Sequence, residues 1–294
     1  MRLSICIPVF NRDMKPLLEE LRKQMEAFPQ EIELLVIDDA SSAEFKRINK
    51  SAKIYADFWH DSPINLGRSK IRNAFLKYIQ GEYILFLDCD ALIPDSAFLE
   101  KYLQAIHQNP EMDLFYGSFD VRKDYLYTLR NKYSSEREIP RKNQSEDLAV
   151  VQTINFIIKT SCLEEFQFDE SLTQYGYEDF IFMQRLKKAG KKVFILENPV
   201  IHDDTTSNTV FLDKTIKAVE SLYQLSLNKE NEGYLNEIRL YSTAKKLKAL
   251  GLKNVGVVGY KMIHRYILKN LKSKNPNLFY YDLFKLGELL KIMK

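Results

Sequence analysis

The sequence predicts an α/β fold with a mostly parallel central sheet, flanking helices and a helical C-terminal extension. In the first half, short β-branched runs alternate with amphipathic stretches, which is the pattern of βαβ units in a helix-covered sheet. Two of these runs end directly in acidic clusters, Asp38-Asp39 and Asp88-Cys89-Asp90, as strands do where such sheets bind ligands. From about residue 210 onward the pattern is mostly helical. We therefore expect one large domain over residues 1–206 and an extension over residues 207–294.

The spacing of apolar residues places the elements of the first half. Expected strands lie at residues 3–9, 33–37, 52–59 (the weakest), 83–87 and 114–119. Expected helices lie at residues 16–28, 68–79 and 95–108, and Gly81 is expected to close the second of them.

Residues 120–147 interrupt this alternation with many charges and little periodicity. A long irregular stretch in a compact protein is usually functional or mobile, so we interpret it as a candidate lid. Order is expected to resume at 150–158, and it continues with a helix at 180–189 that Gly190 ends and a strand at 192–196. The helical tail is expected to break at 251–259 and at Asn275-Pro276.

Charge is divided unevenly along the chain. The formal net charge of +3 over 294 residues does not indicate a nucleic-acid partner, and we expect none. Residues 207–294 carry 16 Lys and Arg against 7 Asp and Glu, whereas residues 1–206 carry 27 against 33. Residues 247–252 and 260–271 interleave these cations with apolar residues. This pattern is typical of a helix packed on the main domain, the commoner case, and also of a helix lying on an anionic membrane.

The cysteines and the N-terminus indicate a cytoplasmic protein. Cys6, Cys89 and Cys162 show no paired spacing, which argues against a disulfide framework or a zinc knuckle. The apolar run at the N-terminus is too short for a signal peptide, and no stretch approaches the roughly 18 apolar residues of a membrane span. Contact with a membrane, if any, is expected at the surface of its inner face.

The motif Asp88-Cys89-Asp90 places two carboxylates at the carboxyl end of a buried strand. Charge at the edge of an apolar run is costly unless a cation or polar ligand is present, and carboxylate oxygens suit Mg²⁺ or Mn²⁺. If the strand geometry continues, both acids share one face and Cys89 turns into the core. A helix cap with a solvated turn acid explains the motif alone equally well.

Residues 65–73 combine a glycine turn with cations in the first turn of a helix. Cations are electrostatically misplaced at a helix N-terminus unless an anion lies between them. Arg68 and Lys70 are also explained as solvated side chains. Asp38 and Asp39, likewise, are well placed for a nucleotide, but one of them can serve as a cap of the next helix.

Five motifs occur in the order Ile7-Pro8-Val9-Phe10-Asn11, Ile37-Asp38-Asp39-Ala40-Ser41, Asn65-Leu66-Gly67 with Arg72-Asn73, Asp88-Cys89-Asp90, and Gly176-Tyr177-Glu178-Asp179. Over residues 1–205 the sequence resembles the family 2 glycosyltransferases, which have a GT-A fold. The resemblance implies a catalytic domain at residues 1–206, with a nucleotide-sugar half (1–119) and an acceptor half (120–206) that includes the candidate lid.

The resemblance also assigns the donor site. Pro8 and Phe10 would shape the floor of the nucleotide pocket, Asp39 would accept the uracil N3 proton, and Arg72 would contact the diphosphate. The loop after Asp39 reads Ala40-Ser41, where the family more often has Gly-Ser. The expected donor-binding residues are Pro8, Phe10, Asn11, Asp39, Asn65, Gly67, Arg72 and Asp88.

The acceptor-side segment around Glu178-Asp179 is also similar to β-galactosyltransferases, in which the acid at the Asp179 position is the general base. Glu178 is the second catalytic candidate, and both acids can instead complement a helix dipole. The resemblance places His202 and Asp90 on the metal. Asp88 is expected to bind the ribose or a metal-bound water, with direct ligation as its alternative, and Asp203 or Asp204 are alternatives to His202.

The expected function is inverting transfer of a hexose from a UDP-sugar to an acceptor hydroxyl with Mn²⁺ or Mg²⁺. The acceptor would be a carbohydrate or a lipid-linked saccharide, in polysaccharide or glycoconjugate synthesis. A dinucleotide-binding oxidoreductase is disfavoured because no glycine-rich turn follows the first strand. The rival hypothesis is a non-catalytic nucleotide-sugar-binding or scaffold protein, which would not hydrolyse a UDP-sugar slowly in the presence of Mn²⁺.

Overall fold

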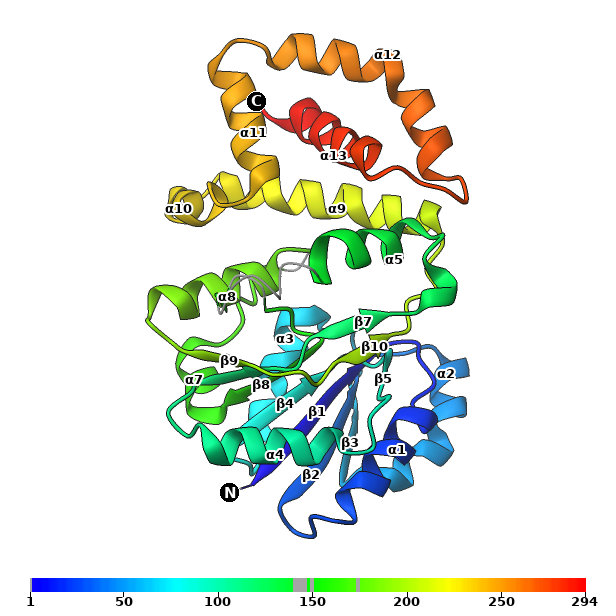
Figure 1. The fold of residues 1–294 in the computed structure, drawn as a ribbon, viewed down its shortest axis with the longest axis vertical. Helices are drawn as coiled ribbons and strands as arrows, with labels where there is room; N and C mark the ends of the chain where they lie inside the picture. Colours follow the sequence, from blue (N-terminus) through cyan, green and yellow to red (C-terminus); the bar gives the residue numbers. More distant parts are fainter. Residues whose placement is uncertain (1, 140–146, 149–150, 173–174) are drawn as a thin grey trace. The chain divides into compact units, whose positions relative to one another are not determined.

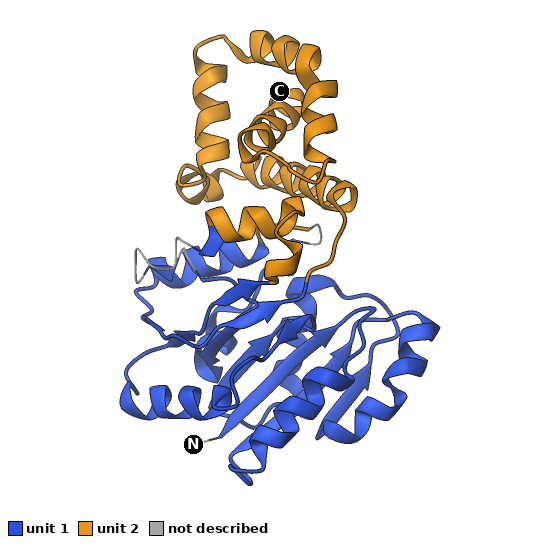
Figure 2. Cartoon of the chain, turned by 45° about the vertical axis from the view of Figure 1, so that its right-hand side comes forward, with its two compact units in different colours: residues 1–121, 138–173, 178–203 blue, residues 122–137, 174–177, 204–294 orange. Residues whose placement is uncertain are grey.

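The computed structural model describes residues 2–139, 147–148, 151–172 and 175–294. The chain divides into two compact units, which Figure 2 shows in different colours. The first unit comprises residues 1–121, 138–173 and 178–203, and the second comprises residues 122–137, 174–177 and 204–294. The chain passes from the first unit to the second for the last time after residue 203, close to the boundary expected at residue 206. Two short earlier segments also belong to the second unit.

A seven-stranded sheet forms the centre of the first unit (Figure 1). Its strands are β1 (Leu3–Val9), β2 (Ile32–Asp38), β3 (Phe58–Asp61), β4 (Tyr83–Leu87), β6 (Leu114–Tyr116), β8 (Asn155–Lys159) and β9 (Val193–Ile195). Their order is β3-β2-β1-β4-β8-β6-β9. β8 runs antiparallel to both of its neighbours, and the other pairs are parallel. The expected α/β fold with a mostly parallel sheet is confirmed.

A second sheet contains three short strands, the first of which follows β4 closely in the sequence. It has the order β5 (Ala91–Leu92), β10 (Val200–His202) and β7 (Phe119–Val121). β10 is antiparallel to β5, and the register pairs His202 with Ala91. This pairing brings the end of β10 beside Asp90 although 112 residues separate them in the sequence.

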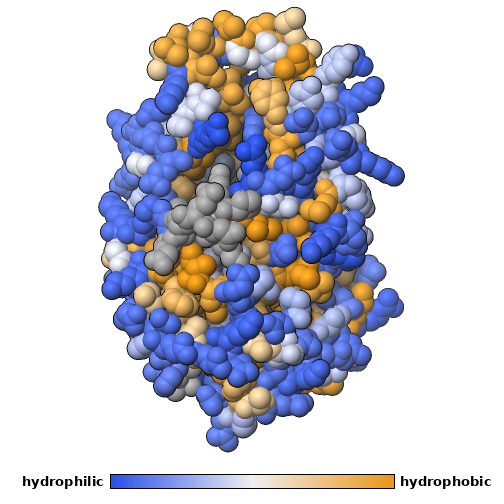
Figure 3. All heavy atoms as spheres, viewed as in Figure 1, coloured by the Kyte–Doolittle hydropathy of each residue, from blue (hydrophilic) through white to orange (hydrophobic). Residues whose placement is uncertain are grey.

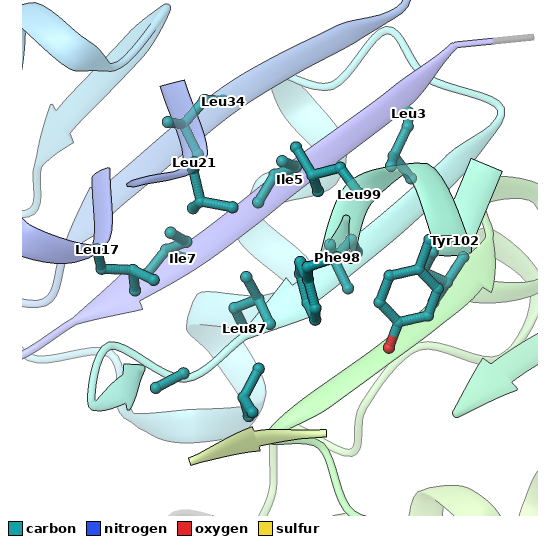
Figure 4. Close-up of a cluster of buried hydrophobic side chains, with 14 of the residues drawn as sticks. Leu3, Ile5, Ile7, Leu17, Leu21, Leu34, Leu87, Phe98, Leu99 and Tyr102 are labelled. Atoms are coloured by element: carbon teal, nitrogen blue, oxygen red, sulfur yellow. The ribbon is translucent and has the colours of Figure 1, made fainter. Parts of the chain in front are cut away.

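Helices cover both faces of the large sheet. They are α1 (Lys15–Met25), α2 (Ala43–Ile48), α3 (Gly67–Ala74), α4 (Phe98–Gln108), α7 (Thr160–Phe166) and α8 (Glu178–Lys188). Successive residues of β1 point to opposite faces. Ile5 packs in a cluster with Leu21 and Phe98, drawn in Figure 4, whereas Cys6 belongs to a second cluster on the other face. A strand buried on both faces is apolar almost throughout, which is why β1 was recognisable in the sequence.

Two expected elements of the first half are wrong in part. The start of the strand expected at residues 52–59 is a 3₁₀ helix, Asn49–Tyr55, and only β3 follows it. Its buried residues, Asn49 and Ala52, are three apart, which is the 3₁₀ period. The helix expected to reach residue 79 ends as α3 followed by a 3₁₀ turn, Phe75–Lys77. Gly81 does not cap it: a Cβ there would lie 2.6 Å from Ser4 Oγ, so close packing requires the glycine.

The strand expected at residues 114–119 is two strands in two sheets. β6 and β7 are separated by Gly117 and Ser118, and Ser118 adopts a φ of 68°. Of the candidate lid at 120–147, the described part contains a 3₁₀ turn (Lys123–Tyr125), α5 (Leu129–Tyr133) and a π-helical turn (Ser134–Glu138). Residues 140–146 of that segment, and residue 150 at the start of the ordered stretch expected at 150–158, lie outside the described residues. Gly190, with a φ of 71°, follows α8 as expected.

The second unit is mainly helical. Its long elements are α9 (Asn208–Ser226), α11 (Arg239–Ala249), α12 (Lys253–Leu271) and α13 (Leu278–Ile292), with the short α10 (Glu232–Leu235) and a 3₁₀ turn (Lys229–Asn231). Tyr260, Ile267 and Phe284 lie in its apolar core. The break expected at 251–259 is shorter than predicted, because α12 begins at Lys253. Within the described residues, no helix combines the length and apolar character needed to cross a bilayer.

Candidate active site

The motif Asp88-Cys89-Asp90 lies in a turn immediately after β4. The Ala91 N–H donates to the Asp88 carbonyl at 3.1 Å, so the strand geometry does not continue through the motif. The premise that would put both acids on one face is therefore wrong, and the two carboxylates bond to different elements. Cys89 packs against the first hydrophobic cluster, and burial raises the pKa of its thiol to about 12.

Arg72 of α3 pairs with the first acid of the motif. Its Nη2 donates to Asp88 Oδ1 at 3.0 Å, and its guanidinium lies over the ring of Phe168. Only 2% of the Arg72 side chain is exposed. Burial raises the pKa of Asp88, and the positive charge of Arg72 opposes that shift. Arg72 therefore holds Asp88 in place, while its contact with a diphosphate stays a prediction.

Replacing Arg72 is expected to destabilise the fold. The variant Arg72→Met keeps much of the side-chain volume but leaves Asp88 without its partner, and breaking a buried ion pair costs roughly 3 to 5 kcal/mol. Asp88 is partly exposed, so we expect the free energy of unfolding, measured with urea at pH 7, to fall by about 3 kcal/mol. Lys70→Met, at an exposed position of the same helix, is the control. Equal stability of the two variants would contradict the structural role of Arg72.

Asp90, the second acid, is paired with His202. His202 Nε2 lies 3.1 Å from Asp90 Oδ2, and the Asp203 N–H donates to the Asp90 carbonyl at 2.8 Å. Burial favours a raised pKa for Asp90, but the charge and hydrogen bond of His202, with the charges of Arg12 and Arg68, lower that pKa to about 2. Asp90 is therefore ionised at neutral pH.

These two side chains fit a divalent cation. Asp90 Oδ1 is buried and has no hydrogen-bond partner in the described structure, which leaves a carboxylate oxygen available as a ligand. Among the described residues, no group of three or more His, Cys, Asp and Glu is gathered for a metal ion, so donor phosphates and water would complete the ligand set. Asp203 is paired with Arg12, and Asp204 lies 3.7 Å from Arg130.

Asp39 joins two loops at the carboxyl edge of the sheet. Its carboxylate accepts the N–H groups of Leu66 and Gly67, and its carbonyl accepts Asn65 Nδ2 at 3.0 Å. Burial raises the pKa of Asp39, and the two backbone N–H groups oppose this. Asp38 instead accepts the Ser41 N–H at 2.7 Å. Of the two acids, Asp38 therefore closes the local turn and Asp39 caps the N-terminus of α3, yet a carboxylate has lone pairs left for a further donor.

The loops around Asp39 expose an aromatic ring. Phe10, directly after β1, is 51% exposed, and the Asp39 N–H donates to the Val9 carbonyl at 2.7 Å. Asn11 Oδ1 accepts the Ser42 N–H at 2.8 Å, which fixes the two loops to each other. Ala40 has a φ of 60°, in the left-handed region that favours glycine, so the backbone here suits the Gly-Ser that the family resemblance implies at this position. Pro8 is half-buried in β1.

Glu178 and Asp179 begin α8 and differ in their surroundings. Glu178 is 4% exposed and lies 3.2 Å from Arg68, and burial together with the charge of Asp179 raises its pKa. Asp179 Oδ1 is buried and has no hydrogen-bond partner within the described residues. The charge of Asp179 also contributes to the raised pKa of Asp88, so the two acids lie close enough to interact. Asp179, near the start of α8, therefore lies within electrostatic range of the acidic motif.

Two cations of this site were not identified from the sequence. Arg68, which solvation could have explained, acts on Asp88, Asp90 and Glu178, and half of its side chain is exposed. Arg12 pairs with Asp203 beside the motif. The misplaced positive charge at the start of α3 was the available signal for Arg68, whereas no sequence pattern marks Arg12.

The described structure thus combines two loops joined through Asp39, an acid-histidine pair at Asp90 and His202, and a carboxylate at Asp179 with one buried oxygen that has no hydrogen-bond partner among the described residues. The fold resembles S. aureus TarS 1-349 in complex with UDP-GlcNAc, with a TM-score of 0.54 at 17% identity over 98% of this chain and 91% of that one. It also resembles the mannosyltransferase PcManGT from Pyrobaculum calidifontis in complex with GDP-Man and Mn²⁺, with a TM-score of 0.59 at 15% identity over 99% and 85%. The chain therefore has the GT-A fold.

The sequence match gives the family. Residues 4–172 match the family model described as Glycosyl transferase family 2, and the chain belongs to that family. A curated relative is the minor teichoic acid biosynthesis protein GgaB of Bacillus subtilis (strain 168), 28% identical over 235 residues. That match covers 76% of this chain and 25% of GgaB, so the chain spans about a quarter of the length of this relative.

Proposed function

We propose that this protein is an inverting, metal-dependent glycosyltransferase that moves a hexose from a UDP-sugar to a hydroxyl of a carbohydrate or lipid-linked saccharide. The observation that carries the proposal is the buried Oδ1 of Asp179, which has no hydrogen-bond partner among the described residues and whose charge acts on Asp88, two residues before Asp90. A single displacement needs a general base for the acceptor proton and groups that stabilise the negative charge of the leaving diphosphate. Membership of glycosyl transferase family 2 supports the reaction class, and relatives with UDP-GlcNAc or GDP-Man support a nucleotide-sugar donor.

In this mechanism the residues of the chain have separate tasks. Phe10 and Asp39 would hold the nucleobase of the donor. Asp88, fixed by Arg72, would orient its ribose. Asp179 takes the proton of the acceptor hydroxyl as its oxygen attacks the anomeric carbon on the face opposite the diphosphate, which inverts the configuration. Asp90 and His202 would hold Mn²⁺ or Mg²⁺, which supplies positive charge to the leaving diphosphate. Arg68 would add a further cation at the same place.

Donor binding tests the proposal at its first step. A thermal-shift series with UDP, UDP-sugars and GDP-mannose, each with and without Mn²⁺, should show stabilisation by UDP compounds that Mn²⁺ increases. A ligand at a hundred times its Kd adds roughly 2.7 kcal/mol to folding stability, which is readily seen as a higher Tm. Stabilisation by GDP-mannose alone would contradict a UDP donor. Binding of a UDP-sugar without any slow hydrolysis or transfer would favour the non-catalytic alternative.

A further inference from the structure

The outer face of α12 is apolar and exposed. Val258, Met262 and Tyr266 follow one another at four-residue spacing, which places them in one row along the helix. Met262 is 80% exposed and Tyr266 is 79% exposed. Val255 extends the same surface by one turn. Helices with large apolar side chains on their outer surface normally bury them, so this row indicates a surface that binds something apolar.

The apolar row is not a part of the core of the second unit that is left uncovered. The opposite face of α12 supplies Tyr260, Ile267 and Leu271 to that core, where α13 packs against them. A Cβ on Gly287 would lie 2.3 Å from the ring of Tyr260, which shows how closely the inner face is packed. In the space-filling view, apolar residues gather at the upper edge, where Figure 1 places α12 (Figure 3). The helix therefore has two apolar faces and only one of them is packed.

A row of cations borders the apolar row. Lys261, Arg265 and Lys269, also at four-residue spacing, occupy the adjacent row of the helix and are exposed, and Lys272 follows one turn later. None of the four forms an ion pair within the part of the chain that the structure describes. Long basic side chains can extend their charge to a polar boundary while their stems cover apolar surface.

The wider segment contains no negative charge. Between Glu237 and Asp282 lie 44 residues with ten Lys and Arg and no Asp or Glu. A second copy of the same face would place cations beside cations with no acid to compensate them, which disfavours self-association. An anionic surface complements both rows at once, because the phosphates meet the cations and the acyl region meets the apolar side chains.

We propose that the outer face of α12 binds anionic lipid bilayers, with the axis of the helix in the plane of the interface and the row from Val255 to Tyr266 at the acyl boundary. The Tyr266 ring suits this position, since tyrosine has an apolar body and a polar tip. The proposal rests on α12 and adds a membrane surface to the donor and acceptor of the proposed reaction.

Vesicle binding by the full chain tests this proposal without donor or metal. Co-sedimentation would be compared between phosphatidylcholine vesicles and vesicles with equal parts of phosphatidylcholine and phosphatidylglycerol, at 0.1 M salt. We expect at least about tenfold tighter binding to the anionic vesicles, and loss of most of that difference at 1 M salt, where the Debye length falls to about 3 Å. Lack of binding to anionic vesicles would overturn the proposal.

Two double variants separate the charged row from the apolar row. Lys261→Glu/Arg265→Glu is expected to weaken anionic-vesicle binding at least about tenfold, and Met262→Ser/Tyr266→Ser is expected to weaken it as well. Arg47→Glu/Lys50→Glu, at exposed positions of the first unit, makes the same change in net charge and should bind like the parent protein. If the control and the α12 charge variant lose vesicle binding equally, net charge alone explains the binding, and the proposal is overturned.

Self-association is the competing use of this face. Light scattering of the parent protein and of Met262→Ser/Tyr266→Ser would show a decrease in mass for the variant if α12 joined two copies, and that result without vesicle binding would overturn the membrane proposal. Nucleotide binding measured without vesicles tests the proposed transferase function separately, so either proposal can fail alone.

Discussion

Asp179→Asn is expected to lower the rate of sugar transfer by roughly a hundredfold to ten-thousandfold, the range that general-base catalysis contributes. The amide has nearly the same shape as the carboxylate but cannot take the acceptor proton. Donor binding should be nearly unchanged, because within the described residues Asp179 forms no hydrogen bond to the loops around Asp39, whose carboxylate instead accepts the N–H groups of Leu66 and Gly67. Initial rates with saturating donor, together with calorimetry of UDP binding, would measure both quantities.

Two comparisons make this result specific. Glu164→Gln, at an exposed position of α7, makes the same chemical change away from the site and should leave the rate unaltered. Glu178→Gln alters the neighbour that is paired with Arg68, so its effect should arise through that pair and be smaller than the effect of Asp179→Asn. Retained turnover in Asp179→Asn would remove Asp179 from the role of base, and a larger loss in Glu178→Gln would transfer that role to Glu178.

The central strands of the sheet could be predicted because they are buried on both faces. β1 and β4 are nearly continuous apolar runs, and such runs are recognisable without any knowledge of their neighbours. The expectations failed where local sequence permits two structures. Residues 49–55 have apolar and β-branched members but bury only every third residue, and Gly117 and Ser118 divide one apolar run between two sheets. At Gly117 the outcome depends on tertiary packing, because a Cβ there would lie 2.2 Å from the Tyr102 hydroxyl.

The sequence predicts the candidate site as a list of residues, whose roles stay predictions, and it says little about how these residues pair. The order of the motifs predicts Asp39, Asp90, Asp179 and His202, and the structure pairs Asp90 with His202 and puts Asp179 within electrostatic range of Asp88. Partners could not be predicted, because pairs such as Arg72 with Asp88 depend on how α3 lies against β4. Arg12 was missed because its partner, Asp203, is 191 residues away in the sequence. The similarity of the segment around Asp179 to β-galactosyltransferases stays a prediction.

Removal of the divalent cation, or of one of its two proposed ligands, should abolish most of the activity. For His202→Ala we expect the activity to fall by at least roughly 10- to 100-fold. Mutation of residues that only support the metal ligands already costs that much, and His202 would contact the metal itself. The same variant should need more Mn²⁺ to reach half of its maximal rate, and direct Mn²⁺ binding in the presence of UDP should weaken in parallel. His107→Ala, at an exposed position of α4, is the matched control and should behave like the parent protein. Full activity after treatment with a chelator would rule out the roles of Asp90 and His202 as metal ligands, and their 3.1 Å pair would then be a structural contact that fixes β10 beside the acidic motif.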